Sequence, residues 1–411
     1  MRFGRGLDIE VGGRPRQEIG AVEVPLVVGL LGSDYPGLRL KPLVEPGAAV
    51  RVGEPVMEDR AHPALCVTAP VSGVVEEVSI GPKRRISALT IRREDGTPRR
   101  FALPGANPSR SEAEALLLDS GLWMAFLARP FGRVPLPGTA PDAIFLTALD
   151  TEPGATDPVP VVTAAAEPFR RGAAFLSHLT DGPVFVCQGP GPALAEPGPR
   201  LRVETFAGPH PAGLPGTHID RLFPIGHGRT VWQIGAQEVI AIGTLLATGE
   251  LPGERVVALG GPLARDPRLV RLPLGADIET MAARESRPGR RRVLSGSALS
   301  GGESRFLRRR HTQIALLPRA EAARPRRWLA SALLKRPPLL PHAALERALG
   351  PGLPAIPLLR ALSLGDAAGA ARLGATALLE EDLALASYLS GGTEDFGARL
   401  RAVLDALEEE A

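Results

Sequence analysis

Cysteine is nearly absent from this 411-residue chain, which contains only Cys66 and Cys187. Two isolated thiols are too few to hold an iron–sulfur cluster or a cysteine-bound zinc ion, and free cysteines are most often buried in a core. Apolar runs are also short: the longest, residues 22–32, includes Glu23 and is well below the roughly 20 residues that span a bilayer. The N-terminus lacks the apolar segment of a secretory signal. These absences predict a cytoplasmic protein without a cysteine-bound metal.

Lysine is scarce as well. Lys41, Lys83 and Lys335 are the only lysines, so arginine supplies 45 of the 48 basic side chains. Together with the abundance of alanine, glycine and proline, this bias indicates a GC-rich genome more than selection for positive charge. The sequence pI of 9.2 therefore does not indicate a nucleic-acid partner, and we expect none.

The charge is nevertheless unevenly distributed along the chain. Residues 284–327 contain thirteen arginines and three glutamates, whereas residues 378–411 are acidic. Such segregation predicts a surface that docks against a partner or against anionic lipid headgroups. The alternative is two solvated faces that partly neutralise each other. The candidate docking residues are Arg290, Arg291, Arg292, Arg308, Arg309 and Arg310.

The lack of lysine matters most in residues 44–78, whose short strands and glycine turns are typical of a biotin or lipoyl carrier domain. A carrier presents a lysine at the tip of its hairpin, because only a primary amine forms the amide to the cofactor. Here Arg60 occupies the tip, and Lys41 and Lys83 lie away from it. We therefore expect residues 1–104 to form a barrel-sandwich hybrid of the biotinyl or lipoyl type with no covalently bound cofactor.

Three further domains are expected after this barrel. The apolar period changes from 2 to 3.6 near Ser111, which with Glu114 predicts a capping box, and strands then alternate with helices. Such alternation predicts a mainly parallel sheet with covered faces. Shorter elements follow, and the chain ends in helical periodicity after a proline-rich connector. The expected domains are a Rossmann-like α/β domain at 105–262, a β-grasp (SLBB-like) domain at 263–318 and a C-terminal helical domain at 319–411.

Motifs for phosphate binding and catalysis are missing. No segment fits the P-loop pattern, and the glycine-rich stretch "CQGPGPAL" (187–194) contains Pro190 and Pro192, which lack the backbone N–H groups that bind phosphate. The histidines are scattered, and His210 and His218 without a third ligand are poorly spaced for a metal. We expect no catalytic residue, no metal and no intrinsic flavin.

The stretch "GPHPAGLPGTHID" (208–220) is the strongest candidate for a ligand site. Its glycines and prolines predict a stiff loop beside a sheet edge, where open α/β sheets bind ligands. His218 would then donate a hydrogen bond or handle a proton. A rigid structural loop is the alternative, and Trp232 is more typical of a core residue than of an aromatic platform. The candidate ligand-binding residues are His210, Gly213, Gly216, His218 and Trp232.

Several long segments together resemble one known family. They are "GLDIEVGGRPRQEI", "APVSGVVEEVSIGPKRRISALTI", "SGLWMAFLARPF", "GPHPAGLPGTHID", "VWQIGAQEVIAIGTLLATGEL", "SGSALSG", "HTQIALLP" and "RLGATALLEEDLALASYLSGG". In this order they resemble the A subunit of the Na+-translocating NADH:quinone oxidoreductase, and the resemblance covers nearly the whole chain.

The resemblance implies a peripheral component on the cytoplasmic face of the bacterial inner membrane, docked on the membrane subunits of a complex and on its B subunit in particular. The complex passes electrons from NADH to ubiquinone and exports Na+, and NAD and the flavins belong to its other subunits. The family member carries no redox centre but is linked to ubiquinone binding. The resemblance also implies an α/β domain similar to the flavin-binding subunit of complex I, and a barrel in which a basic residue such as Arg60 is not an attachment site.

The chain departs from the family pattern at several points. Gly235 and Ala236 stand where an Asn-Tyr pair is usual, and Leu389 and Ser390 stand where relatives have Cys-Pro. The segment between "HTQIALLP" and the C-terminal helices is shorter than the family pattern. Two alternatives therefore stay open: a stand-alone quinone- or flavin-binding homologue of the same fold, and a soluble flavin reductase.

Overall fold

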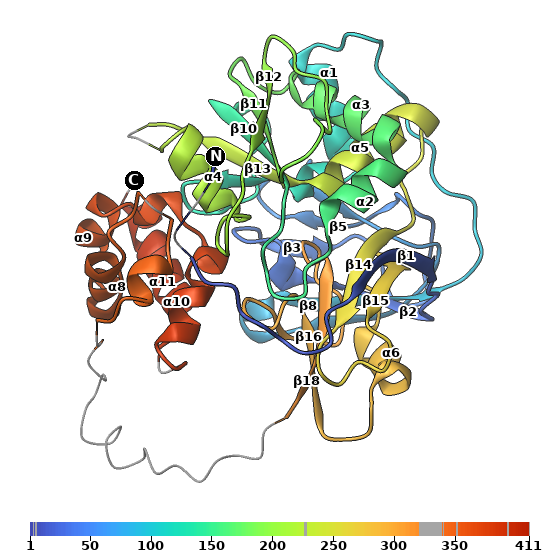
Figure 1. Cartoon of the computed structure of the whole chain (residues 1–411). Coiled ribbons are helices and arrows are strands. Elements are labelled where there is room, and N and C mark those ends of the chain that lie inside the picture. Colours follow the sequence, from blue (N-terminus) through green and yellow to red (C-terminus); the bar gives the residue numbers. More distant parts are fainter. Residues whose placement is uncertain are drawn as a thin grey trace.

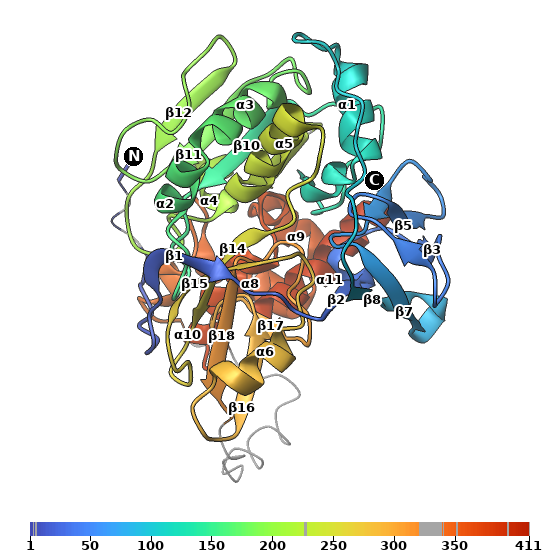
Figure 2. The ribbon, with the colours of Figure 1, turned by 90° about the vertical axis from the view of Figure 1, so that its right-hand side faces the viewer.

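The computed structural model describes the chain from Met1 to Glu410 apart from residues 3, 5, 226–227, 320–338, 340, 351 and 393. Four bodies can be followed in Figure 1 and, turned by 90°, in Figure 2: a small β unit, an α/β unit, a mixed sheet and a group of C-terminal helices. Among the described residues, none of the helices has the length and apolar character needed to cross a membrane.

The N-terminal unit consists of two small antiparallel sheets packed around one core. The first has the order β2 (Val27–Leu31), β8 (Ile86–Arg93), β7 (Gly73–Ile80), β4 (Ala49–Val50), and the second has the order β3 (Leu40–Pro42), β5 (Pro55–Asp59), β6 (Cys66–Thr68). Arg60 follows β5 directly, is exposed, and donates its backbone N–H to the carbonyl of Arg39. The exposed arginine therefore lies in the β5–β6 hairpin connection, where the sequence predicts it.

The α/β unit contains a five-stranded sheet. Its order is β12 (Leu201–Thr205), β11 (Val184–Gln188), β10 (Ala143–Ala148), β13 (Val231–Gly235), β9 (Leu127–Arg129), and all pairs are parallel except β13 with β9. Alternate residues of each strand are buried on opposite faces. Ile144 and Leu146 pack with α3 (Ala166–Leu176) and α5 (Ala236–Thr248), whereas Phe145 packs with α4 (Pro215–Leu222). The chain runs outward from β10 to β12 and then returns to β13 on the other side of β10.

The capping box of helix α1 (Arg110–Asp119) lies two residues earlier in the chain than predicted. Ser109 and Glu112, not Ser111 and Glu114, form the reciprocal cap: the Glu112 backbone N–H donates to the Ser109 hydroxyl, and the Glu112 carboxylate accepts from the Ser109 backbone N–H. Two overlapping S-x-x-E patterns occur in this segment, and spacing alone does not distinguish them.

The third body is a six-stranded mixed sheet whose strands come from distant parts of the chain. Its order is β1 (Arg16–Val22), β15 (Arg268–Leu272), β14 (Arg255–Gly260), β18 (Gln313–Pro318), β16 (Arg291–Ser295), β17 (Gly302–Glu303), with α6 (Ile278–Glu285) against it. Two of its strands come from ranges predicted for other domains: β1 falls within the predicted barrel range 1–104, and β14 falls within the predicted α/β range 105–262. A short apolar run bounded by glycine or proline fits either sheet, so the pattern could not assign these strands.

The C-terminal helices form a core of their own. They are α8 (Ala355–Leu364), α9 (Ala367–Arg372), α10 (Ala384–Leu389) and α11 (Phe396–Glu409). Leu359, Leu383 and Phe396 are completely buried in this core. The shorter elements of the chain are α2 (Pro158–Ala164) and the 3-10 turns η1 (Gly32–Asp34), η2 (Pro82–Arg84), η3 (Leu122–Ala125), η4 (Leu345–Arg347), η5 (Ala375–Ala377) and η6 (Glu380–Leu383).

Arg129 joins this helical group to the α/β sheet. Its side chain, at the end of β9, is 0% exposed and makes an ion pair of 2.9 Å with Asp382, which lies in η6. Arg129 also donates to Gln233 Oε1 at 2.7 Å and to the carbonyl of Ala377. Because both charged groups are buried, removing either one would leave the other without compensation. The pair therefore fixes η6 beside β9 and β13 at the edge of the sheet.

Candidate ligand cavity at the sheet edge

A large cavity of about 1530 Å³ lies at the carboxyl ends of β10 and β13. Leu149 and Asp150 follow β10, and Gly235 ends β13, so these residues form the inner wall. Because the chain leaves β10 in one direction and returns to β13 in the other, this is the topological switch point at which open α/β sheets bind ligands. The remaining walls come from residues 33–36, 296–301, 308–313 and 379–401. All four bodies of the fold therefore contribute to the lining.

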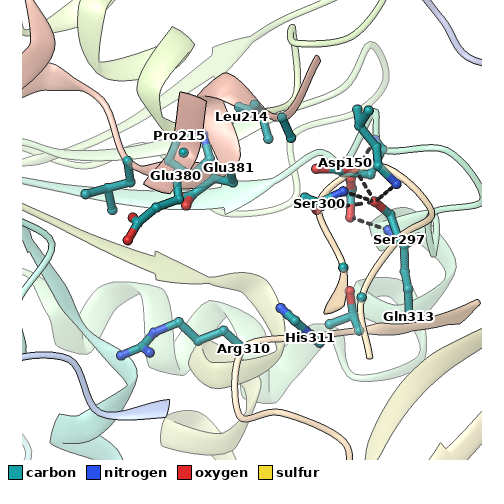
Figure 3. Close-up of a pocket in the computed structure, with 18 of the residues that line it drawn as sticks. Asp150, Leu214, Pro215, Ser297, Ser300, Arg310, His311, Gln313, Glu380 and Glu381 are labelled. Atoms are coloured by element: carbon teal, nitrogen blue, oxygen red, sulfur yellow. Dashed lines mark hydrogen bonds between the residues drawn. The ribbon is translucent and has the colours of Figure 1, made fainter. Parts of the chain in front are cut away.

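Two half-buried carboxyl groups, those of Asp150 and Glu152, lie at this sheet edge, and Figure 3 labels Asp150. Asp150 accepts hydrogen bonds from the backbone N–H of Glu152 at 2.9 Å and from Gln313 Nε2 at 3.3 Å, and burial raises its pKa. Glu152 accepts from the Ser297 hydroxyl at 2.5 Å. Burial and the neighbouring Asp150 raise the pKa of Glu152 to about 7. Glu152 can therefore hold or release a proton near neutral pH.

The C-terminal helices bring further carboxyl groups to the cavity. Glu380 and Glu381 lie together in Figure 3, on a different wall from Asp150. Burial and the adjacent Asp382 raise the pKa of Glu381. Glu380 is held differently: Arg401 binds it at 2.7 Å and lowers its pKa against the opposing effect of burial. Both neighbours have a guanidinium group within ion-pair distance: Arg401 pairs with Glu380, and Arg129 lies 3.5 Å from Glu381.

Basic groups line the wall around residues 308–313. Burial and Arg308 lower the pKa of His311 to about 4, so its imidazole is neutral at pH 7, with Nδ1 2.9 Å from the Ser295 hydroxyl. Burial and Arg309 lower the pKa of Arg310 to about 10, so it stays charged. Its guanidinium donates to the carbonyls of Asp34 and Met124 at 2.7 and 3.3 Å.

The lining as a whole is acidic. Among the described residues it contains eight carboxyl side chains, Asp34, Asp150, Glu152, Glu238, Glu380, Glu381, Glu394 and Asp395, but only three guanidinium groups, Arg308, Arg310 and Arg401. A dianionic phosphate group would therefore meet more carboxyl than guanidinium groups, which is electrostatically unfavourable. A neutral ligand meets no such penalty, and the serines and glutamine supply hydrogen bonds to it.

The segment 208–220 contributes to the cavity only in part. Gly213, Leu214 and Pro215 line it, but α4 begins at Pro215, so the expected loop is half helix. Gly213 packs closely against the backbone of a neighbouring segment, because an added Cβ would lie 2.6 Å from the Thr151 nitrogen. Gly216 is buried, and an added Cβ would collide with the Asp382 carboxylate. Both glycines therefore permit close packing between elements.

His210 and His218 do not line the cavity. His218 lies on α4, is 0% exposed, and its ring packs 4.2 Å from that of Phe206. Its Nε2 donates to the Ala212 carbonyl at 2.9 Å, and burial lowers its pKa to about 4. His210 is 1% exposed, with Nδ1 3.3 Å from the Thr151 hydroxyl. Ligand binding by these two histidines stays a prediction, and neither is among the residues that line the cavity.

Trp232 is a core residue. It is 1% exposed and packs edge-on against Trp123, with ring centroids 5.1 Å apart, on the face of the sheet covered by α3 and α5. The apolar residues around Trp232 in the sequence predict this core position. Among the cysteines, Cys187 is buried in β11 as expected, while Cys66 is half-buried in β6.

The candidate docking arginines do not form one surface. Arg308, Arg309 and Arg310 hydrogen-bond inside the molecule: the Arg309 backbone N–H, for example, donates to Asp34 at 2.9 Å. In β16, Arg291 and Arg292 pair with Glu279 and Glu303 at 3.6 and 2.7 Å. Arg290 is exposed, and so are Arg284 and Arg287. The arginines of the predicted stretch beyond residue 319 lie outside the described residues.

Sequence reasoning missed the residues that line the cavity most closely. Asp150 and Glu152 follow a buried strand, and acidic residues at that point are a usable signal, because strand ends in parallel sheets carry ligand sites. Ser297 and Ser300 belong to the segment "SGSALSG", which contributed to the resemblance but was assigned no role. Their approach to Glu152 depends on contacts between separate bodies of the fold, which no local pattern encodes.

Comparison with known proteins matches each described part except the C-terminal helices to a family model. Residues 1–94 match the NqrA N-terminal barrel-sandwich hybrid domain, residues 109–251 the NqrA second alpha/beta domain, and residues 256–305 the NQRA C-terminal domain. Among solved structures, an NAD+-reducing [NiFe]-hydrogenase in its air-oxidized state is 13% identical with a TM-score of 0.36, covering 73% of this chain and 67% of that one. This score is too low to support any conclusion.

Curated relatives extend over the whole chain. The A subunit of the Na(+)-translocating NADH-quinone reductase of Klebsiella pneumoniae subsp. pneumoniae is 37% identical over 445 residues, that of Neisseria meningitidis serogroup A 38% over 445, and that of Pseudomonas aeruginosa 37% over 447. In each case 100% of both chains is covered. The chain therefore belongs to the NqrA family, the A subunits of the Na(+)-translocating NADH-quinone reductase.

Proposed function

We propose that this chain is the cofactor-free, peripheral NqrA component of a Na+-translocating NADH:ubiquinone oxidoreductase and that its large cavity contributes to quinone binding. It would lie on the cytoplasmic face of the membrane and contact the membrane subunits, the B subunit in particular. NAD and the flavins would belong to the other subunits. The observation that supports quinone binding most directly is the acidic cavity at the switch point, which contains the half-buried carboxyl group of Glu152 with its pKa raised to about 7.

A quinone fits this cavity chemically. It is neutral and planar, and its two carbonyl oxygens accept hydrogen bonds. Donors are available from the Ser300 hydroxyl, from the amide of Gln233 and from Glu152 when it is protonated. Flavin and nicotinamide cofactors carry phosphates, which the acidic wall disfavours. Because reduction of a quinone to a quinol takes up protons, a group with a pKa of about 7 suits the site.

Titration of a soluble ubiquinone analogue against the purified chain tests this assignment. We expect Glu152→Ala to weaken binding by roughly 2- to 13-fold at pH 6, because one hydrogen bond contributes about 0.5–1.5 kcal/mol. The exposed Glu196 provides the matched control, and Glu196→Ala should bind like the wild type. Equal affinities for the wild type and Glu152→Ala would remove Glu152 from the site.

The cofactor-free character has its own test. Flavin absorbance that survives extensive dialysis of the purified chain, in stoichiometric amount, would contradict it. The same spectrum would favour the flavin-binding alternative, including a soluble flavin reductase. Intact mass spectrometry should likewise find no lipoyl or biotinyl addition, because Arg60 stands at the hairpin tip.

One observation favours a second candidate function, a stand-alone homologue with an altered ligand. Gly235, Ala236 and Leu389, three of the positions at which the sequence departs from the family pattern, all line the large cavity. Smaller side chains at 235 and 236 widen the wall at the end of β13. Co-purification of the chain with membrane subunits from solubilised membranes would support the complex, and its recovery entirely without them would support the stand-alone protein.

A further inference from the structure

A second cavity, of about 380 Å³, lies where the N-terminal unit, the α/β unit and the six-stranded sheet meet. It has Asp34, Val161, Gln237 and Glu238 in common with the lining of the large cavity, so the two spaces are neighbours. Exposed residues at its lining, Ala164, Glu254 and Arg271, indicate a route to solvent. Its volume falls within the roughly 300–1,000 Å³ of small-molecule sites.

Most of this cavity is apolar. Its walls come from Ile19 and Leu30, from Ile240 and Ala241 on α5, and from Leu251, Leu274 and Leu307. Such a wall favours an aliphatic or aromatic body, because each methylene group that leaves water for an apolar wall strengthens binding.

The polar residues of the cavity lining include three guanidinium groups, Arg255, Arg271 and Arg309, and three carboxyl groups, Asp34, Glu238 and Glu254. Arg309 donates to the carbonyls of Met124 and Gly121 at 3.2 and 3.4 Å, and no carboxylate of the described residues lies within ion-pair distance of its guanidinium. The side chain of Arg255 is only 8% exposed, and its Nη2 binds Glu238 at 2.5 Å. Its Nε, however, has no hydrogen-bond partner in the part of the chain that the structure describes.

None of the three carboxyl groups forms an ion pair with the guanidinium of Arg309, and Glu254 is exposed. Glu238 is already paired with Arg255. Asp34 accepts the backbone N–H of Arg309, and burial raises its pKa, which disfavours its charged form. Arg309 is half-buried without an ion pair and Arg255 is buried with a free Nε, so an anionic head group would give both guanidinium groups a charged acceptor.

We propose that this second cavity binds an anionic amphiphile, a medium-chain fatty carboxylate, with its head on Arg309 and Arg255 and its chain along the apolar wall. A neutral ligand would leave Arg309 uncompensated, and a small anion without a chain would leave the apolar wall empty. Because three bodies of the fold line the cavity, the bound ligand also stabilises their junction. This inference does not depend on quinone binding in the large cavity.

Calorimetric titration of the full chain with dodecanoate, below its micelle-forming concentration, tests the site. Dodecanol provides the uncharged analogue of the same chain length and should bind at least roughly tenfold more weakly. We expect Arg309→Met to weaken dodecanoate binding by roughly 10- to 100-fold, since hydrogen bonds to charged groups are the stronger class. Arg284→Met, at an exposed arginine on α6, is the matched control and should not change the affinity.

A second variant separates ligand binding from folding. Ala241→Phe fills the cavity from α5 and removes no charge, so it should abolish dodecanoate binding. It should not change the affinity for a ubiquinone analogue in the large cavity, because Ala241 is not among the residues that line that cavity. Circular dichroism checks that each variant is folded. If dodecanol binds as tightly as dodecanoate, or if folded Ala241→Phe binds dodecanoate like the wild type, the inference is overturned. If Arg309→Met fails to fold, two measurements still test the inference: dodecanoate binding to Ala241→Phe and dodecanol binding to the wild type.

Discussion

Burial determines what individual residues do in this molecule, and His218 shows it most clearly. Its ring is enclosed between Phe206 and the Ala212 carbonyl, although glycine and proline around it suggest an exposed loop. Local sequence predicts the turn but not the distant strand that covers it. For the same reason Asp150 and Glu152 could be recognised only as acidic residues after a strand, while their hydrogen-bond partners Ser297 and Gln313 come from another body of the fold.

Replacement of His218 tests this assignment. We expect His218→Ala to lower the free energy of unfolding by about 2–4 kcal/mol, because it leaves a cavity and removes a buried hydrogen bond. His62→Ala, at an exposed histidine, should change it by less than about 0.5 kcal/mol. Urea denaturation measures both. A stable His218→Ala variant with weakened quinone binding would restore the histidine to the ligand site.

The raised pKa of Glu152 predicts how the free energy of unfolding depends on pH. Its pKa is about 7 in the folded chain against an ordinary value of 4.5, so the folded state binds the proton more tightly. The carboxyl group therefore imposes no penalty below pH 4.5, and the penalty grows to about 3 kcal/mol as the pH rises through 7. Glu152→Gln should consequently gain more stability over the wild type at pH 8 than at pH 5. Urea midpoints at the two pH values measure the difference, and an equal gain at both would contradict the raised pKa.

At the scale of elements, periodicity located most strands and helices but not always their sheet. The patterns of residues 142–150 and 237–250 predict a strand and a helix, which correspond to β10 and α5. The apolar run 21–31 predicts one strand, yet Pro25 divides it, so that β1 and β2 pair in different sheets. Proline cannot donate to a ladder, which explains the break. The choice of sheet for each half depends on long-range pairing that a local window does not contain.

Helix α4 owes its position to the absence of a side chain at Gly216. A methyl group there would meet the Asp382 carboxylate and separate it from Arg129. We expect Gly216→Ala to destabilise the chain by about 2–4 kcal/mol, because disrupting a buried ion pair outweighs the gain in helix propensity. Gly198→Ala provides the control, since its Cβ would enter open space. If thermal melts show Gly216→Ala to be as stable as Gly198→Ala, the close contact between α4 and η6 is not important for stability.

At the scale of the whole molecule, contacts between bodies build the sites that no single domain contains. The large cavity needs the sheet edge, the loop 296–301 and η6 together, and the second cavity lies at a junction of three bodies. The run Arg308–Arg310 illustrates the consequence for charge. The sequence suggests an exposed basic patch, but the side chains of Arg309 and Arg310 hydrogen-bond to segments from the first 125 residues and help to hold the bodies together.

Docking through positive charge remains a prediction, and it concerns Arg290 of the candidate set together with the nearby Arg284 and Arg287. Arg284, Arg287 and Arg290 are exposed, in and just after α6, and none has an ion pair within the described part of the chain. Attraction from exposed charges weakens as the Debye length falls from about 10 Å at 0.1 M salt to about 3 Å at 1 M. Washing membranes with 1 M salt should therefore release more of the chain than washing with 0.1 M, and the triple change Arg284→Gln, Arg287→Gln, Arg290→Gln should release it at lower salt.

The control for this experiment removes the same charge from another exposed region, through Arg170→Gln, Arg171→Gln and Arg202→Gln. Because α3 and β12 carry these residues, they lie on the α/β unit and away from α6, as Figure 2 shows for the two helices. A general effect of net charge would release both triple variants equally, whereas a docking surface at α6 releases only the first. If salt at either concentration releases the same amount of wild-type chain, electrostatic attraction does not hold it. The exposed apolar residues Val24 and Leu26, beyond β1, would then be the next surface to substitute.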